Sequence, residues 1–241
     1  MKQSGLDLTQ GNLLKNLLKL SLPIMFSNFL QTFYNLTDTF WLGKLGENAK
    51  GAVSVAGLAF PLIFFLSSFG FGFVIAGTSL ISQYKGANQI EKTRQVVGQF
   101  IILVVLFCII FISGSLIFLD EILYLLRTPA EIFSIAIEYI SVILIGVVFM
   151  FIFMSYQSFS HGLGDTISPM KIQIFSVGLN VILDPILIFG IGFFPKLETF
   201  GAALATLIAR ILAAGIAVYF YLRKCPRSFL KRKISIRTQK C

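Results

Sequence analysis

Long apolar stretches separated by short polar connections constrain this chain more than any other feature. A helix needs about 20 apolar residues to cross the hydrocarbon core of a bilayer. Six stretches of the 241-residue chain meet that length, and they cover about residues 13–43, 51–84, 95–119, 132–159, 169–191 and 200–222. The sequence therefore predicts an all-α integral membrane protein, a six-transmembrane-helix bundle with no room for an extramembrane domain. Pro23 is expected to bend the first helix.

The composition excludes other classes of protein. Charged residues make up 13% of the chain and the mean hydropathy is +0.85, against roughly 25% charged residues in a soluble domain. The sequence contains no HExxH, GxSxG, Walker A or GxGxxG motif, so we expect no enzyme activity.

The basic residues predict the orientation. Of the 20 Lys and Arg residues, fifteen fall on the side of the two termini and four on the opposite side, which predicts that both termini are cytoplasmic. The expected division is a cytoplasmic N-terminus at 1–12, the six-helix lobe at 13–222 and a basic cytoplasmic tail at 223–241. A basic tail next to a span indicates contact with membrane lipids rather than nucleic acid.

Two carboxylates, Asp38 and Asp184, lie well inside the predicted spans, whereas Glu138 lies near the start of one. A carboxylate there costs about 2.5 to 3.5 kcal/mol on insertion scales, which makes both residues candidates for function. At 1.5 Å of rise per residue, Asp38, Asp184 and Thr206 all fall roughly 10 to 12 Å below the outer surface. Glu138 and Arg210 are weaker candidates.

Further oxygen atoms are expected at the same depth in the membrane as Asp38, Asp184 and Thr206. Asn180 lies one turn from Asp184, and Ala202 lies one turn from Thr206 and offers a backbone carbonyl. Such a set suits Na⁺ or a carboxylate pair that carries a proton. A structural interpretation stays open, because Asp184 precedes Pro185 and the polar side chains around Asp38 can join helices by hydrogen bonds.

Several motifs, taken in order, resemble the N-terminal lobe of multidrug and toxic compound extrusion (MATE) transporters. The resemblance covers about residues 13–223. The matching segments are Pro23, Tyr34-Asn35-Leu36-Thr37-Asp38-Thr39-Phe40-Trp41-Leu42-Gly43, Gly162-Leu163-Gly164-Asp165-Thr166 with Pro169, Asn180 with Asp184-Pro185, and Gly201-Ala202-Ala203-Leu204-Ala205-Thr206.

The resemblance implies an antiporter of the plasma (inner) membrane that uses Na⁺ or H⁺ to export amphipathic, often cationic, compounds. In that family the residues matching Asp38, Asn180, Asp184 and Thr206 form the cation site, here expected to hold Na⁺, and the residue matching Ala202 contributes its carbonyl. A bend at the position of Pro23 accompanies changes at the site. No cofactor is implied beyond the coupling ion.

One departure from the family pattern concerns length. Members have two six-helix lobes, whereas this chain matches one, and its basic segment at 223–241 resembles the start of the linker between the lobes as well as a cytoplasmic tail. A second lobe is therefore expected from a homodimer or a separate chain, unless the chain is a truncated form. Two alternatives stay open at this point. A lipid-linked oligosaccharide flippase of the same superfamily would need a strongly cationic cavity, for which only Arg210 is available, and a non-transporting membrane subunit would need no site at all.

Overall fold

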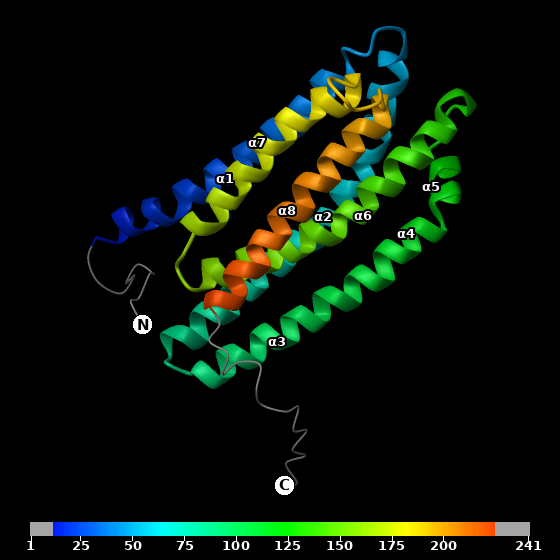
Figure 1. Ribbon diagram of the computed structural model, residues 1–241. Coiled ribbons are helices and arrows are strands. Elements are labelled where there is room, and N and C mark those ends of the chain that lie inside the picture. Colours follow the sequence, from blue (N-terminus) through cyan, green and yellow to red (C-terminus); the bar gives the residue numbers. More distant parts are fainter. Residues whose placement is uncertain (1–11, 225–241) are drawn as a thin grey trace.

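The computed structural model describes residues 12–224, and its regular structure in that range is helical (Figure 1). The long helices are α1 (Leu13–Leu42), α2 (Ala49–Gly86), α3 (Ile90–Phe107), α6 (Ala130–Gly162), α7 (Ile167–Phe189) and α8 (Glu198–Lys224). The short elements are the 3₁₀ turn η1 (Gly46–Asn48), the π-helical turn η2 (Cys108–Ile112), α4 (Ser113–Ile117) and α5 (Leu119–Leu125).

The six long helices confirm the predicted all-α membrane bundle. Five segments are long and apolar enough to cross a membrane, namely 46–86, 90–117, 130–162, 167–189 and 198–223. The sixth long helix, α1, has 30 residues and carries a row of polar side chains that includes Asn28, Gln31, Asn35 and Asp38. The expected N-terminal segment, except Asn12, and the expected basic tail from residue 225 onward lie outside the described residues.

The third span differs from its expected form. We expected one helix over 95–119 followed by an irregular connection, but α3 passes into the π turn of η2 and ends with α4. The Phe107 ring stacks on Phe111 with a centroid separation of 4.4 Å, across this wider turn. The expected connection contains α5, which forms because Leu119 and Leu123 share one buried helical face.

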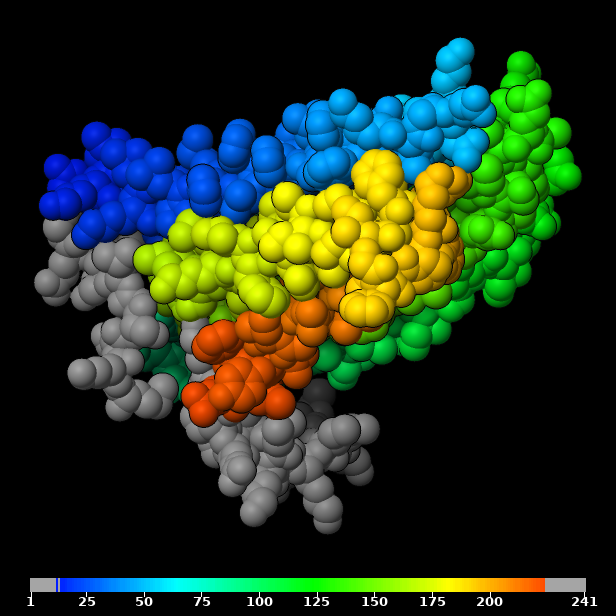
Figure 2. Space-filling view, turned by 45° about the horizontal axis from the view of Figure 1, so that its top comes forward, coloured from blue at the N-terminus to red at the C-terminus, as the bar shows by residue number. Residues whose placement is uncertain are grey.

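The helices do not pack in the order of the chain. α1 lies against α7, α7 against α8, α8 against α6, α6 against α2, and α2 against α3. Figure 2 shows α1 and α7 side by side along their length. The consecutive helices α1 and α2 make few contacts with each other. They therefore leave a space that α6, α7 and α8 line from behind.

The turn between α6 and α7 has the irregular backbone that its sequence predicts. Gly164 has a φ of +79°, which favours glycine. The Asp165 carboxylate accepts hydrogen bonds from the Ser168 backbone N–H at 3.0 Å and from the Ser168 hydroxyl at 2.7 Å. The Lys85 ammonium donates to the Leu163 carbonyl at 2.8 Å, so the last turn of α2 is joined to this turn.

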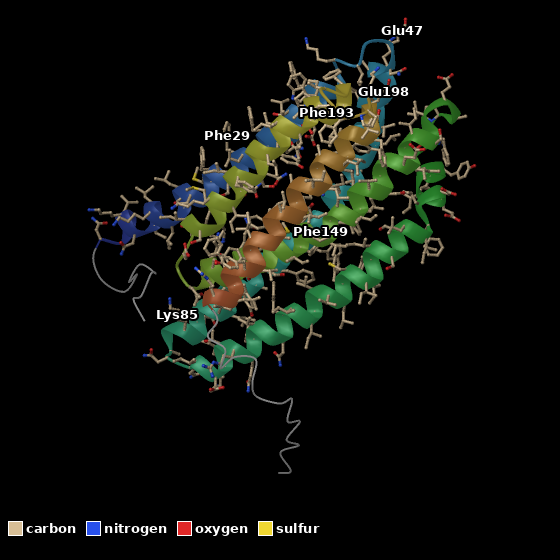
Figure 3. All side chains as sticks on the ribbon, in the orientation of Figure 1. Phe29, Glu47, Lys85, Phe149, Phe193 and Glu198 are labelled. Atoms are coloured by element: carbon tan, nitrogen blue, oxygen red, sulfur yellow. The ribbon has the colours of Figure 1, made fainter. Side chains whose placement is uncertain are left out.

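A second polar cluster joins connections at the opposite end of the bundle. Figure 3 shows Glu47 and Glu198 at one end and Lys85 at the other. Glu198 accepts a hydrogen bond from the Asn48 side chain at 2.9 Å and pairs with Lys196 at 2.9 Å. Each end of the bundle thus has a polar contact between segments distant in sequence.

The close packing of α8 on α7 gives a stability prediction. A Cβ atom on Gly201 would lie 2.5 Å from the Leu187 carbonyl oxygen, whereas a Cβ on Gly215 of the same helix meets nothing within 4 Å. Overpacking costs about 1 to 3 kcal/mol, and alanine favours a helix over glycine by about 1 kcal/mol. We expect Gly201→Ala to lower the melting temperature of the purified protein by several degrees, and Gly215→Ala to leave it unchanged or higher. Equal melting temperatures for the two variants would contradict the close approach of α8 to α7.

Candidate cation-binding site

A cavity of about 260 Å³ lies between α1 and α2, in front of α6, α7 and α8. Its wall carries two kinds of side chain. Polar groups come mainly from α1, whereas aromatic rings and thioethers come from α2 and α6. The polar lining includes Asn28, Gln31, Asn35, Asp38, Gln173, Thr206 and Arg210, and the apolar lining includes Phe60, Phe64, Met150, Phe153 and Met154. The cavity is thus amphipathic.

Asp38 joins α1 to α8 at this cavity. Its carboxylate oxygen Oδ2 accepts a hydrogen bond from the Thr206 hydroxyl at 3.3 Å. The residues are 168 positions apart in the chain, and the packing of both α1 and α8 against α7 brings them together. The equal depth predicted for Asp38 and Thr206 is confirmed by this contact.

Asp184 and Asn180 complete the group from α7. The Asn180 side-chain N–H donates to Oδ1 of Asp184 at 3.0 Å, and both residues are fully buried. The carboxyl groups of Asp184 and Asp38 are close enough to influence each other electrostatically, and Asn180 is a neighbour of both. The structure therefore brings four of the predicted site residues into one cluster, which comprises Asp38, Asn180, Asp184 and Thr206.

Three oxygen atoms of this cluster are buried and accept no hydrogen bond from the described residues. They are Oδ1 of Asp38, Oδ2 of Asp184 and Oδ1 of Asn180. A buried oxygen without a partner costs free energy, more so when it belongs to a carboxylate. Carboxylate and amide oxygens are ligands for hard cations, and two adjacent carboxylates can also share a proton. The cluster is suited to hold a monovalent cation or a proton.

The other two predicted residues are Ala202 and Pro23. Ala202 is fully buried one turn before Thr206 in α8. Pro23 lies inside α1, which continues as one helix through it, and the Pro23 carbonyl accepts a hydrogen bond from the Ser27 hydroxyl at 2.9 Å. The contribution of the Ala202 carbonyl and the bend at Pro23 stay predictions.

Sequence reasoning missed several residues of the cavity. The Gln173 amide donates to Gln31 at 3.0 Å and links α7 to α1. The two residues are 142 positions apart, so no local sequence pattern predicts this hydrogen bond. Tyr34 and Tyr139 are buried beside the carboxylates. Of the two weaker candidates, Glu138 is exposed, whereas Arg210 lines the cavity.

A bundle of membrane-length helices around an amphipathic cavity, with carboxylates buried at its wall, defines an integral membrane protein of the transporter class. The chain belongs to the MatE family, whose model matches residues 23–186. The family consists of transporters, so the prediction that the chain is not an enzyme is confirmed. The resemblance to MATE transporters is confirmed as well.

Comparisons with individual proteins are consistent with membership of this family. The chain is 35% identical over 203 residues, 84% of its length, to the probable multidrug resistance protein YoeA of Bacillus subtilis (strain 168), of which the match covers 43%. It is 29% identical over 209 residues, 87% of its length, to the multidrug export protein MepA of Staphylococcus aureus (strain NCTC 8325 / PS 47), of which the match covers 45%. A crystal structure of a MATE protein in the bent conformation superposes with a TM-score of 0.84 at 26% identity, and the match covers 95% of this chain and 53% of that one.

The chain spans about half the length of the relatives it matches. Those relatives are therefore long enough to hold a second region comparable in size to the described bundle. This agrees with the expectation that a second lobe completes the transporter. The comparisons do not favour the flippase alternative.

Proposed function

We propose that this chain forms one six-helix lobe of a cation-coupled antiporter that exports amphipathic, cationic compounds. The single observation that carries the proposal is the group of three buried oxygens on Asp38, Asn180 and Asp184 that have no hydrogen-bond partner within residues 12–224. A Na⁺ ion between these oxygens would be held by Asp38, Asn180, Asp184 and Thr206, with the Ala202 carbonyl as a further donor. A proton would instead be shared between the two carboxylates.

The amphipathic lining supports the substrate class. Aromatic rings such as Phe60 and Phe153 can hold an apolar body, while Asp38 faces the same cavity and attracts a positive charge. The coupling cation and a cationic substrate then compete for one carboxylate. Binding of either favours release of the other, which is the thermodynamic requirement for exchange of the two.

Transport itself requires a second bundle. Rocking transporters form their substrate path between two helix bundles, and here the cavity lies between α1 and α2, where the two helices make few contacts. A second copy of this lobe or a different six-helix lobe would cover that side. The cation site lies within one lobe, and the substrate path needs two.

We propose that the protein lies in the plasma membrane with both termini on the cytoplasmic side. A cysteine introduced at Lys196, on the connection between α7 and α8, is expected to react with a membrane-impermeant maleimide added to intact cells. A cysteine at Lys85, at the opposite end of the bundle, is expected to react only after lysis. These labelling experiments use a variant without the native cysteines, and the reverse pattern would contradict the orientation.

Trp41 provides a test of cation binding without any added label. It is the single tryptophan of the chain, it lies three residues after Asp38 in α1, and its ring packs edge-on against Phe189 of α7 at 6.0 Å between centroids. A cation at Asp38 changes the contact between α1 and α7. We expect Na⁺ or a decrease in pH to change the fluorescence of Trp41 in a saturable way.

The controls for this titration separate binding from general ionic effects. Choline at the same ionic strength should give no change. Asp184→Asn should abolish the saturable response, because it removes one carboxylate of the pair. Glu138→Gln removes a carboxylate from an exposed position of α6 and should retain the response. A response that survives Asp184→Asn would contradict the proposed site.

A further inference from the structure

Arg210 occupies an unusual place for a cation in a membrane protein. It lies in α8, four residues after Thr206 and thus on the same helical face, and it lines the cavity together with Asp38. A charged side chain at this depth is costly unless a group of opposite charge or a set of acceptors satisfies it. Its surroundings therefore matter.

The packing of α6 against α8 makes room for this guanidinium. A Cβ atom on Gly146 of α6 would lie 3.3 Å from Nη1 of Arg210 and 3.4 Å from its Cδ. Any larger residue at position 146 would push against the side chain. The glycine thus keeps the guanidinium at the cavity wall.

Arg210 forms no hydrogen bond or ion pair with the side chains and backbone of residues 12–224. Its Nη1 atom is buried and makes no hydrogen bond there. The two ion pairs between described residues join Arg94 to Glu91 and Lys196 to Glu198, so neither involves Arg210. Arg210 and Asp38 interact electrostatically, but the two side chains form no ion pair. Nη1 lies against Gly146, while the Arg210 side chain as a whole lines the cavity. A guanidinium at a cavity wall that has no acceptor among the described residues indicates a ligand that supplies one.

We infer that Arg210 is the residue that binds the acidic group when this lobe binds a compound that carries both an ammonium and a carboxylate. The inference rests on the proposed function and assigns a specificity-determining residue of the same cavity. The carboxylates around Asp38 receive the ammonium group of such a compound, Arg210 receives its carboxylate, and the apolar body lies against rings such as Phe153. Guanidinium groups pair well with carboxylates, because two parallel N–H donors match the two oxygens.

Two fluorescent probes that differ in one group test this inference. Nε-dansyl-lysine carries an α-ammonium and a carboxylate, whereas Nε-dansyl-lysinamide has the same skeleton with a neutral amide in place of the carboxylate. Dansyl emission rises in apolar surroundings, so each probe can be titrated against the purified full chain in nanodiscs. We expect the acid to bind about tenfold more tightly than the amide, the effect of one charge-assisted hydrogen bond.

Variants at Arg210, Gly146 and Arg223 provide the controls. Arg210→Gln should reduce the preference for the acid to about one while the amide still binds, and Arg210→Lys should retain part of the preference. Gly146→Ala should reduce it without removing a charge, which keeps the test available if Arg210→Gln does not fold. Arg223→Gln, at the end of α8 and stacked on Tyr219, should retain the full preference.

The outcomes separate this inference from the proposed function. Equal binding of the two probes to the unmodified chain, or a preference that survives Arg210→Gln, overturns the role of Arg210 and leaves the proposed function intact as long as Trp41 still responds to the coupling cation. Binding of neither probe also overturns the inference. If Trp41 is unresponsive as well, the proposed function fails with it.

Discussion

Extrusion of ethidium by a two-lobed assembly is expected to fall to the level of empty vesicles when Asp38 of this chain is replaced by Asn. The substitution removes the charge that attracts the coupling cation and leaves Asp184 without its partner carboxylate. The Asn side chain still accepts a hydrogen bond from Thr206, so the contact of α1 with α8 is retained. The measurement is the rate of dye extrusion after a Na⁺ or pH gradient is imposed across proteoliposomes.

The matched control for this prediction is Glu138→Gln. It also removes one carboxylate from a membrane-length helix, but Glu138 is exposed and does not line the cavity. We expect its extrusion rate to stay within a factor of two of the unmodified assembly. Gradient-driven extrusion at an unchanged rate in Asp38→Asn would show that the buried carboxylates serve only to hold helices together.

The chain alone is expected to show no gradient-driven extrusion, although it retains the cation response of Trp41. The reason is geometric: the carboxylate cluster lies within one bundle, whereas the cavity is bordered by α1 and α2, which make few contacts with each other. Reconstitution of the purified chain, with and without a matching second lobe, gives the comparison. Extrusion should appear only when both are present.

Extrusion by the chain alone would mean either that two copies form the substrate path or that the path lies within a single bundle. Cysteines placed on the cavity-facing side of α1, for example at Asn28, distinguish these cases. A crosslink between copies, together with loss of extrusion on crosslinking, identifies a homodimer. Extrusion without any such crosslink contradicts the two-lobe account of the path.

The sequence predicted the parts of this molecule that depend on local pattern. Hydropathy identified the six long helices, because each must be apolar over the thickness of a bilayer. The rise per residue placed Asp38 and Thr206 at one depth, and their side chains meet at 3.3 Å. These properties follow from the regular geometry of a helix and need no knowledge of which helices are neighbours.

The features that the sequence did not predict depend on which helices are neighbours. The Gln31–Gln173 hydrogen bond and the contact of Asn48 with Glu198 join segments more than 140 residues apart. Local periodicity carries no information about such pairs. Arg210 could have been placed at the cavity from its helical spacing to Thr206, but its lack of a partner became visible only once α6 and α8 were packed together.

The packing of α1 on α7 has a consequence for biosynthesis. α1 ends at Leu42 and α7 begins at Ile167, so about 125 residues must be added between them, which takes roughly 6 to 25 s at a synthesis rate of 5–20 residues per second. During that interval α1, with Asp38 among its polar residues, has no α7 to lie against. α1 must therefore be sheltered by the insertion machinery or remain at the membrane surface until α7 arrives.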